Sequence, residues 1–149
     1  EIAGGGRVDG PRGLPLLKPP YGRITAIDLN KGEIVWMTPN GDGPRRQVNE
    51  VLSRLGLNGT DVGPLGGMGR AGPLLTKTLL FVGEGPHDPL AQPMFRAYDK
   101  ATGKVVWEFK LGSHVMGAPM TYLAGGRQYI VVACGFRKWP HELVALSLP

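Results

Sequence analysis

Cysteine is nearly absent from this 149-residue chain, and long apolar runs are missing altogether. The single thiol, Cys134, excludes an internal disulfide and any zinc site built from several cysteines. The longest apolar runs have the length of strands and fall well short of the roughly 20 residues that a membrane-spanning helix needs. We therefore expect a packed globular segment that carries no membrane-spanning part.

Runs of like charge are missing too, although the formal net charge is +5. Basic residues are scattered, and adjacent pairs occur only at Arg45-Arg46 and Arg137-Lys138, without interleaved aromatic residues. This pattern is typical of a solvated protein surface. We therefore expect no nucleic-acid partner.

The most informative feature that is present is an internal repeat. The stretch AIDLNKGEIVW at residues 26–36 returns as AYDKATGKVVW at residues 97–107. Each copy consists of an apolar strand, a polar turn that contains glycine, and a second strand rich in Val and Ile, which is the pattern of a β-hairpin. Four residues recur at matched offsets: Ala26, Asp28, Gly32 and Trp36 in the first copy, and Ala97, Asp99, Gly103 and Trp107 in the second.

The turn of each copy has a predictable chemistry. An aspartate can accept hydrogen bonds from backbone N–H groups of its own turn, so we expect this of Asp28 and Asp99. A glycine adopts positive φ without steric cost, so we expect this conformation at Gly32 and Gly103.

A weaker repeat precedes the second hairpin and recurs after it, near the end of the chain. AGPLLTKTLLFVGEG at residues 71–85 and GAPMTYLAGGRQYIVVACG at residues 117–135 both show a small residue, a proline and two strands separated by a turn. Combined with the hairpin, they predict a four-stranded antiparallel unit of roughly 40 residues, the size of a β-propeller blade.

This period divides the chain, taken as one domain over residues 1–149, into parts of a propeller. Residues 21–38 finish one blade, residues 71–111 form a complete blade, and residues 117–149 supply a final one. The predicted fold is all-β, a partial propeller of about two to three blades. A ring needs at least four blades, so the remaining ones are expected upstream in a longer chain or through self-association at open sheet edges.

Residues 39–70 interrupt the period and are expected to form an insertion between blades. A short helix over about residues 44–55 is predicted, because Val48, Val51, Leu52 and Leu55 fall on one helical face. Pro44 suits the first turn of such a helix, and Gly56 suits its C-terminal cap.

The Ala-x-Asp-x-x-x-Gly-x-x-x-Trp pattern resembles the tryptophan-docking motif of the eight-bladed quinoprotein alcohol and sugar dehydrogenases. The segment KPPYGRITAIDLNKGEIVW is similar to a late-blade segment of membrane-bound glucose-type members, and GAPMTYLAGGRQYIVV is similar to a segment near the end of sugar and alcohol members. The resemblance covers residues 13–149. It implies the C-terminal blades of an enzyme that uses pyrroloquinoline quinone (PQQ).

The resemblance also implies an activity. Family members oxidise an alcohol or a sugar and pass electrons to a quinone or a cytochrome, with a bound Ca²⁺ that polarises the cofactor and an aspartate that acts as base. Those catalytic and metal-binding residues belong to earlier blades, so no catalytic residue and no metal ligand is assigned to this chain. The fragment is expected to be inactive alone, and family members imply a periplasmic location.

One cofactor contact is implied within the chain. CGFRKWP at residues 134–140 is similar to a glycine-rich loop that reaches the quinone in alcohol-type members, with Gly135 and Trp139 at matching positions. Arg137 and Lys138 replace two glycines of that loop, which places positive charge where a tricarboxylated cofactor would lie. An aromatic side chain that packs the rim of the propeller is the alternative interpretation of Trp139.

The three histidines and the single cysteine are expected to have structural rather than chemical roles. His87, His114 and His141 share no spacing, so turn or surface positions are expected for them rather than a metal site. Cys134 ends an apolar strand and is expected to be a buried, unreactive thiol.

As an alternative to an enzyme fragment, the chain could serve as a non-catalytic propeller-repeat module for protein–protein assembly.

Overall fold

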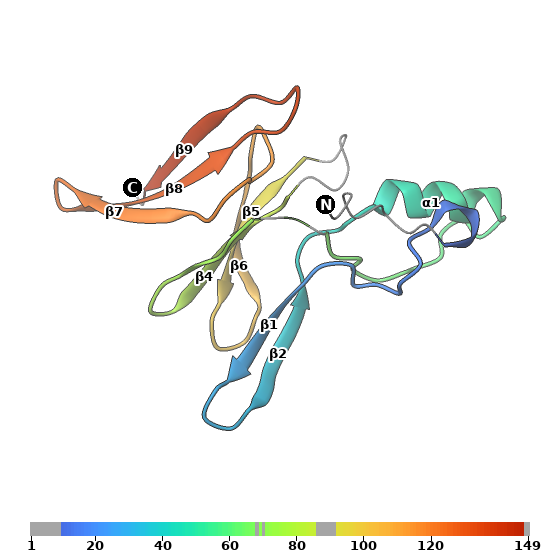
Figure 1. Cartoon of the computed structure of the whole chain (residues 1–149), viewed down its shortest axis with the longest axis horizontal. Coiled ribbons are helices and arrows are strands. Elements are labelled where there is room, and N and C mark those ends of the chain that lie inside the picture. The colour runs from blue at the N-terminus through green and yellow to red at the C-terminus, as the bar shows by residue number, and fades with distance from the viewer. Residues whose placement is uncertain (1–9, 68, 70, 86–91, 148–149) are drawn as a thin grey trace, which may run out of the picture.

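The computed structural model describes residues 10–67, 69, 71–85 and 92–147, which form three antiparallel sheets and one α-helix. Figure 1 shows the three sheets side by side, with α1 set apart from them. The first sheet pairs β1 (Arg23–Asp28) with β2 (Glu33–Pro39). The second has the order β3 (Leu74–Leu75), β4 (Leu79–Gly83), β5 (Met94–Asp99), β6 (Val105–Lys110), and the third has β7 (Met120–Ala124), β8 (Arg127–Cys134), β9 (Glu142–Ser147).

Both copies of the repeat form hairpins with the same irregularity. Ala26 lies opposite Trp36 in β1–β2, and Ala97 lies opposite Trp107 in β5–β6. In each hairpin the register shifts directly after the alanine. The repeat therefore specifies the same local backbone path twice.

The predicted turn chemistry is confirmed in both hairpins. The Asp28 carboxylate accepts a hydrogen bond from Asn30 N at 2.9 Å, and the Asp99 carboxylate accepts one from Thr102 N at 2.8 Å. Gly32 and Gly103 both have φ of +71°. The hydrogen bonds from Thr102 also lower the pKa of Asp99.

The middle sheet packs against both of its neighbours, because its strands bury alternating residues on opposite faces. Leu80, Val82 and Tyr98 form a cluster against which Ile24 and Trp36 of the first sheet pack. Residues of the opposite face of β4 and β5 share a second core with the third sheet and with the connection between β6 and β7. Its buried members are Phe81, Phe95, Ala97, Leu111, Val115, Val132 and Cys134.

Trp36 joins the first sheet to the hairpin turn of the second. Its indole Nε1 donates a hydrogen bond to the Lys100 carbonyl at 3.0 Å. A Cβ atom added to Gly103 would lie 2.6 Å from Cε3 of Trp36, so the indole occupies the space that the missing side chain leaves. Its repeat counterpart Trp107 remains 40% exposed and contacts Phe95 and Phe109 of its own sheet.

Helix α1 (Arg45–Arg54) lies within the predicted insertion. It buries Val48 and Val51, whereas Leu55, which falls on the same helical face, is 38% exposed. Leu55 is the C-terminal cap and keeps right-handed helical backbone angles, φ of −93° and ψ of 0°. Gly56 follows with φ of +72°, as predicted for the capping glycine. No helix in the described part of the chain is long and apolar enough to cross a membrane.

Candidate functional site

The longer connections of the chain meet at one end of the sheets, which we call the loop end. They follow β2, β4, β6 and β8, whereas the short turns lie at the opposite end, because successive antiparallel strands run in alternating directions. Hydrogen bonds link the segments that directly follow these four strands, each to the next. Asn40 Nδ2 donates to Gly83 O at 3.3 Å, Val115 N to Glu84 O at 3.1 Å, and Gly135 N to His114 O at 2.9 Å.

The predicted cofactor loop, residues 134–140, leaves β8 at this loop end. Gly135 is buried and has φ of +154°, a conformation open to glycine, and an added Cβ would lie 2.9 Å from the ring of His141. Trp139 N donates to Phe136 O at 2.9 Å, which closes a turn. The loop therefore needs glycine at position 135 for its backbone path.

Trp139 is half-buried against a histidine. The rings of Trp139 and His114 meet edge to face, with centroids 5.3 Å apart and planes at 86°. Phe136 contacts the same imidazole with a centroid distance of 6.0 Å. The indole is thus held from one side by the protein.

Two cationic residues directly precede Trp139 in the chain. Arg137 and Lys138 are both exposed, and the Arg137 guanidinium lies 5.1 Å from the centroid of the Phe136 ring. Arg137 has φ of +52°, a left-handed conformation that glycine adopts more readily. The backbone therefore keeps a conformation that suits the glycine of the family pattern even though an arginine stands here.

The expected surface placement of the histidines was wrong for His114. Its exposed fraction is 0%, because it lies in Ser113–Val115, a fully buried segment between the exits of β4 and β8. His141 is exposed, whereas His87 lies outside the described residues. Among the described residues, no group of three or more His, Cys, Asp or Glu side chains gathers into a candidate metal site.

A buried ion pair that the sequence did not indicate occupies the middle of the loop end. Glu84 is 5% exposed and pairs with Arg96, while its second oxygen accepts a hydrogen bond from Met94 N at 3.1 Å. Arg96 Nε also donates to Glu108 at 3.2 Å. Burial by itself would lower the pKa of Arg96, but the hydrogen bond and charge of Glu84 raise it overall.

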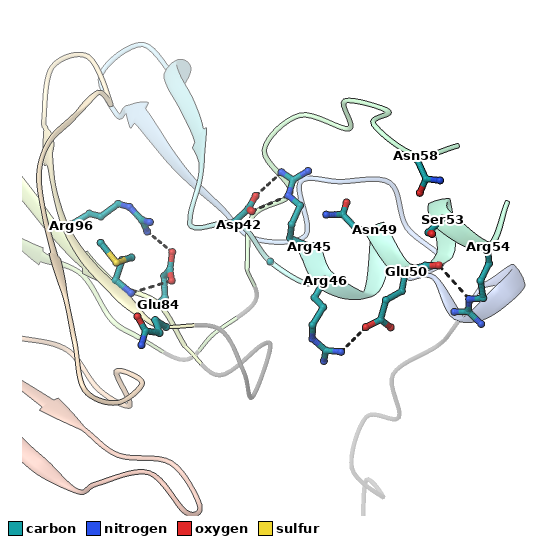
Figure 2. Close-up of a pocket in the computed structure, with 13 residues that line it drawn as sticks. Asp42, Arg45, Arg46, Asn49, Glu50, Ser53, Arg54, Asn58, Glu84 and Arg96 are labelled. Atoms are coloured by element: carbon teal, nitrogen blue, oxygen red, sulfur yellow. Dashed lines mark hydrogen bonds and ion pairs between the residues drawn. The ribbon is translucent and has the colours of Figure 1, made fainter. Parts of the chain in front are cut away.

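An open cavity of about 1010 Å³ separates this ion pair from helix α1. Figure 2 shows Glu84 and Arg96 on one side of it and the polar face of α1 on the other. The α1 side carries two further ion pairs, Arg45 with Asp42 and Arg46 with Glu50, at 2.6 and 2.8 Å. The cavity is therefore polar, and its charges are largely compensated within its own walls.

Cys134 is the first residue of the predicted cofactor loop and has an exposed fraction of 6%. Burial, with a contribution from the Glu142 charge, raises the pKa of the thiol to about 11. The thiol therefore stays protonated near neutral pH and is a poor nucleophile.

Comparison with known proteins assigns the family. The model of the β-propeller domain of PQQ-dependent glucose, ethanol and alcohol dehydrogenases matches residues 4–130, most of the chain. The chain belongs to this family of quinoprotein propellers. The prediction of a partial β-propeller with one inserted helix is thereby confirmed.

Relatives of this quinoprotein segment act on different substrates according to their names. It is 33% identical to a probable quinate dehydrogenase (quinone) of Xanthomonas campestris pv. juglandis, over 92% of this chain and 17% of the relative. It is 34% identical to a glycerol dehydrogenase large subunit of Gluconobacter thailandicus, over 92% and 18%. It is 31% identical to a quinoprotein glucose dehydrogenase of Escherichia coli, over 93% and 17%.

The length of the match is as informative as its identity. The chain spans 17–18% of the length of these three relatives, so most of a family propeller lies outside it. A solved quinohemoprotein alcohol dehydrogenase from Comamonas testosteroni aligns with 76% of this chain and 12% of its own, at 28% identity and a TM-score of 0.46.

Proposed function

We propose that this chain supplies the closing blades of a PQQ-dependent dehydrogenase that oxidises a sugar or an alcohol and passes electrons to a quinone or a cytochrome. The family match over residues 4–130 is the observation that carries the proposal. Under this proposal, residues 21–38, 71–111 and 117–149 belong to successive blades. The location proposed for the whole enzyme is the periplasm.

The proposed contact with the cofactor is the loop that holds Gly135 and Trp139. A flat indole fixed on one side by His114 offers a stacking surface to a planar ring system. Exposed Arg137 and Lys138 supply positive charge for the carboxylates of the cofactor. The residues present therefore fit a planar, polyanionic group.

The cofactor, when bound with Ca²⁺, supplies the electrophilic carbonyl that accepts hydride from the substrate carbon. The residues of this chain contribute binding and orientation rather than proton transfer. The base and the calcium ligands belong to the part of the family propeller outside these residues. The isolated chain is accordingly proposed to be inactive.

Exposed apolar residues support a place within a larger ring. We propose that the Trp36 contact with Gly103 is the family's tryptophan docking. We also propose that half-exposed Trp107 makes the same kind of contact with another blade of the whole propeller. In the third sheet, Met120 is 56% exposed and Leu143 is 75% exposed. Remaining blades of the propeller are the proposed partners of these surfaces.

The activity of the chain by itself is the first test. Purified chain is mixed with PQQ and Ca²⁺, and cofactor absorbance and dye-linked oxidation of glucose and ethanol are followed. We expect no turnover, because the base and the metal ligands are missing. Sugar-dependent turnover by these 149 residues would contradict the fragment interpretation.

Trp139→Ala tests the proposed cofactor contact in the longer dehydrogenase that carries this segment. We expect PQQ affinity to fall by about tenfold or more, since stacking on an aromatic ring contributes about 1–3 kcal/mol. Tyr122→Ala is the matched control, because Tyr122 is a 40% exposed aromatic residue stacked on Tyr129, in the third sheet but away from the loop. If both variants bound PQQ as tightly as the parent enzyme, the proposed contact between Trp139 and the cofactor would be contradicted.

A non-catalytic assembly module is the second candidate function. The exposed apolar residues of β2, Ile34 and Val35 at 57% and 58%, favour association through sheet faces. Light scattering of the purified chain distinguishes the two. A homogeneous ring-sized oligomer that takes up no cofactor would favour assembly over the enzyme fragment.

A further inference from the structure

Two of the four asparagines of the chain precede a glycine, at Asn40-Gly41 and Asn58-Gly59. Glycine has no side chain to hinder attack of its backbone nitrogen on the preceding side-chain amide. Both Asn-Gly pairs lack this hindrance, so the structure around each pair decides whether the backbone nitrogen can reach the side-chain amide.

Asn58 is exposed in the loop that follows α1. Thr60 holds this turn, since both its N–H and its hydroxyl donate to the Leu57 carbonyl, at 3.3 and 2.9 Å. Gly59 has φ of +78°, and no atom lies within 4 Å of the position that a Cβ would take. The peptide group between Asn58 and Gly59 is therefore open to water, and its rearrangement requires only that this exposed turn open locally.

Asn40 is held on all sides by comparison. Its Nδ2 donates to Gly83 O at 3.3 Å, and its Oδ1 accepts from the Tyr98 hydroxyl at 3.2 Å. Its backbone carbonyl accepts from Gly67 N at 2.6 Å, and the carbonyl of Gly41 accepts from Gly66 N at 3.1 Å. The amide carbon of Asn40 cannot meet the next nitrogen unless these bonds open.

We propose that Asn58 is a site of spontaneous deamidation. The Gly59 nitrogen attacks Cγ of Asn58, the bond from Cγ to the side-chain nitrogen breaks, and ammonia leaves with the proton released from the Gly59 nitrogen. Water then opens the resulting five-membered imide at either carbonyl and leaves aspartate or isoaspartate. No oxidant and no other co-reactant is required.

The modification changes the charge of the cavity, because Asn58 is one of its lining residues. Four arginines line this cavity against three carboxylates, Asp42, Glu50 and Glu84, which gives a formal charge of +1. A carboxylate at position 58 brings that charge to zero. Deamidation therefore removes the net positive charge from the wall that faces the loop end.

The test is a time course of the purified chain at mildly alkaline pH, followed by tryptic digestion and mass spectrometry. Asn58 and Asn40 fall in separate peptides, residues 55–70 and 32–45. We expect the peptide with Asn58 to acquire the mass of the acid, and the one with Asn40 to do so more than about tenfold more slowly, because it must first open locally. Equal rates in the folded chain, or a stable Asn58, would overturn the proposal.

Two controls isolate the cause. In denaturant both peptides are expected to convert at similar rates, since each holds the same Asn-Gly pair. Gly59→Ala is expected to suppress conversion of Asn58 without changing that of Asn40. Conversion of Asn58 at an undiminished rate in Gly59→Ala would contradict the proposed step, because the added Cβ is expected to hinder attack by the nitrogen of residue 59.

Discussion

Arg96→Met is expected to lower the free energy of unfolding by about 3–5 kcal/mol, because it leaves a buried carboxylate without its cation. Glu84, the partner of Arg96, has a side chain only 6% exposed, so its carboxylate has little direct contact with water. Methionine keeps much of the length and volume of the arginine stem. The loss therefore reports the missing charge, and urea denaturation of the purified chain measures it.

Arg46→Met is the matched control for that substitution. The Arg46–Glu50 pair has the same chemistry, but its side chains are 49% and 54% exposed, so water screens the charges. We expect a loss of less than about 1 kcal/mol. Similar losses in the two variants would show that burial of the Glu84–Arg96 pair does not set its contribution.

Gly103→Ala is expected to destabilise the chain by about 2–5 kcal/mol. The left-handed backbone at position 103 costs roughly 1–2 kcal/mol for any residue with a Cβ, and a crowded contact costs about 1–3 kcal/mol more. The crowding follows from the added Cβ, which would lie 2.6 Å from the Trp36 indole. Urea denaturation measures the loss, and Trp36 fluorescence is expected to shift as the indole moves.

Gly32→Ala separates the two contributions, because Gly32 is the repeat counterpart of Gly103. Both glycines have φ of +71°, but a Cβ at Gly32 meets no atom within 4 Å. We expect this variant to show the backbone cost alone, about 1–2 kcal/mol. If the two alanine variants lost equal stability, the close packing of Trp36 on Gly103 would have no energetic weight.

The hairpins could be predicted from sequence because their causes are local. The Asp28 and Asp99 carboxylates accept hydrogen bonds from backbone N–H groups of their own turns. The positive φ angles of Gly32 and Gly103 are likewise set within those turns. Helix α1 was predicted within one residue at each end for the same reason. Leu55 falls on the same helical face as Val48 and Val51 but is exposed, because burial at a helix end depends on which other elements cover it.

The candidate site was predicted only in part. Resemblance to a family loop pointed to Gly135 and Trp139. The structure shows their contacts with the rest of the protein, while their contact with PQQ stays a prediction. His114 was missed because one histidine between two strands carries no periodic signal. A weak signal was available in its apolar neighbours, Leu111 and Val115, which share the core with the third sheet.

The sequence by itself determined the repeated hairpin, the antiparallel sheets and the family, because hydrophobic alternation and turn chemistry act over a few residues. Only the tertiary structure decided which groups that lie far apart in the sequence meet. Glu84 and Arg96 are 12 residues apart and meet because β4 and β5 pair, whereas Trp36 and Lys100 are 64 apart and meet because the first and second sheets pack side by side. No pattern along a single strand specifies these contacts.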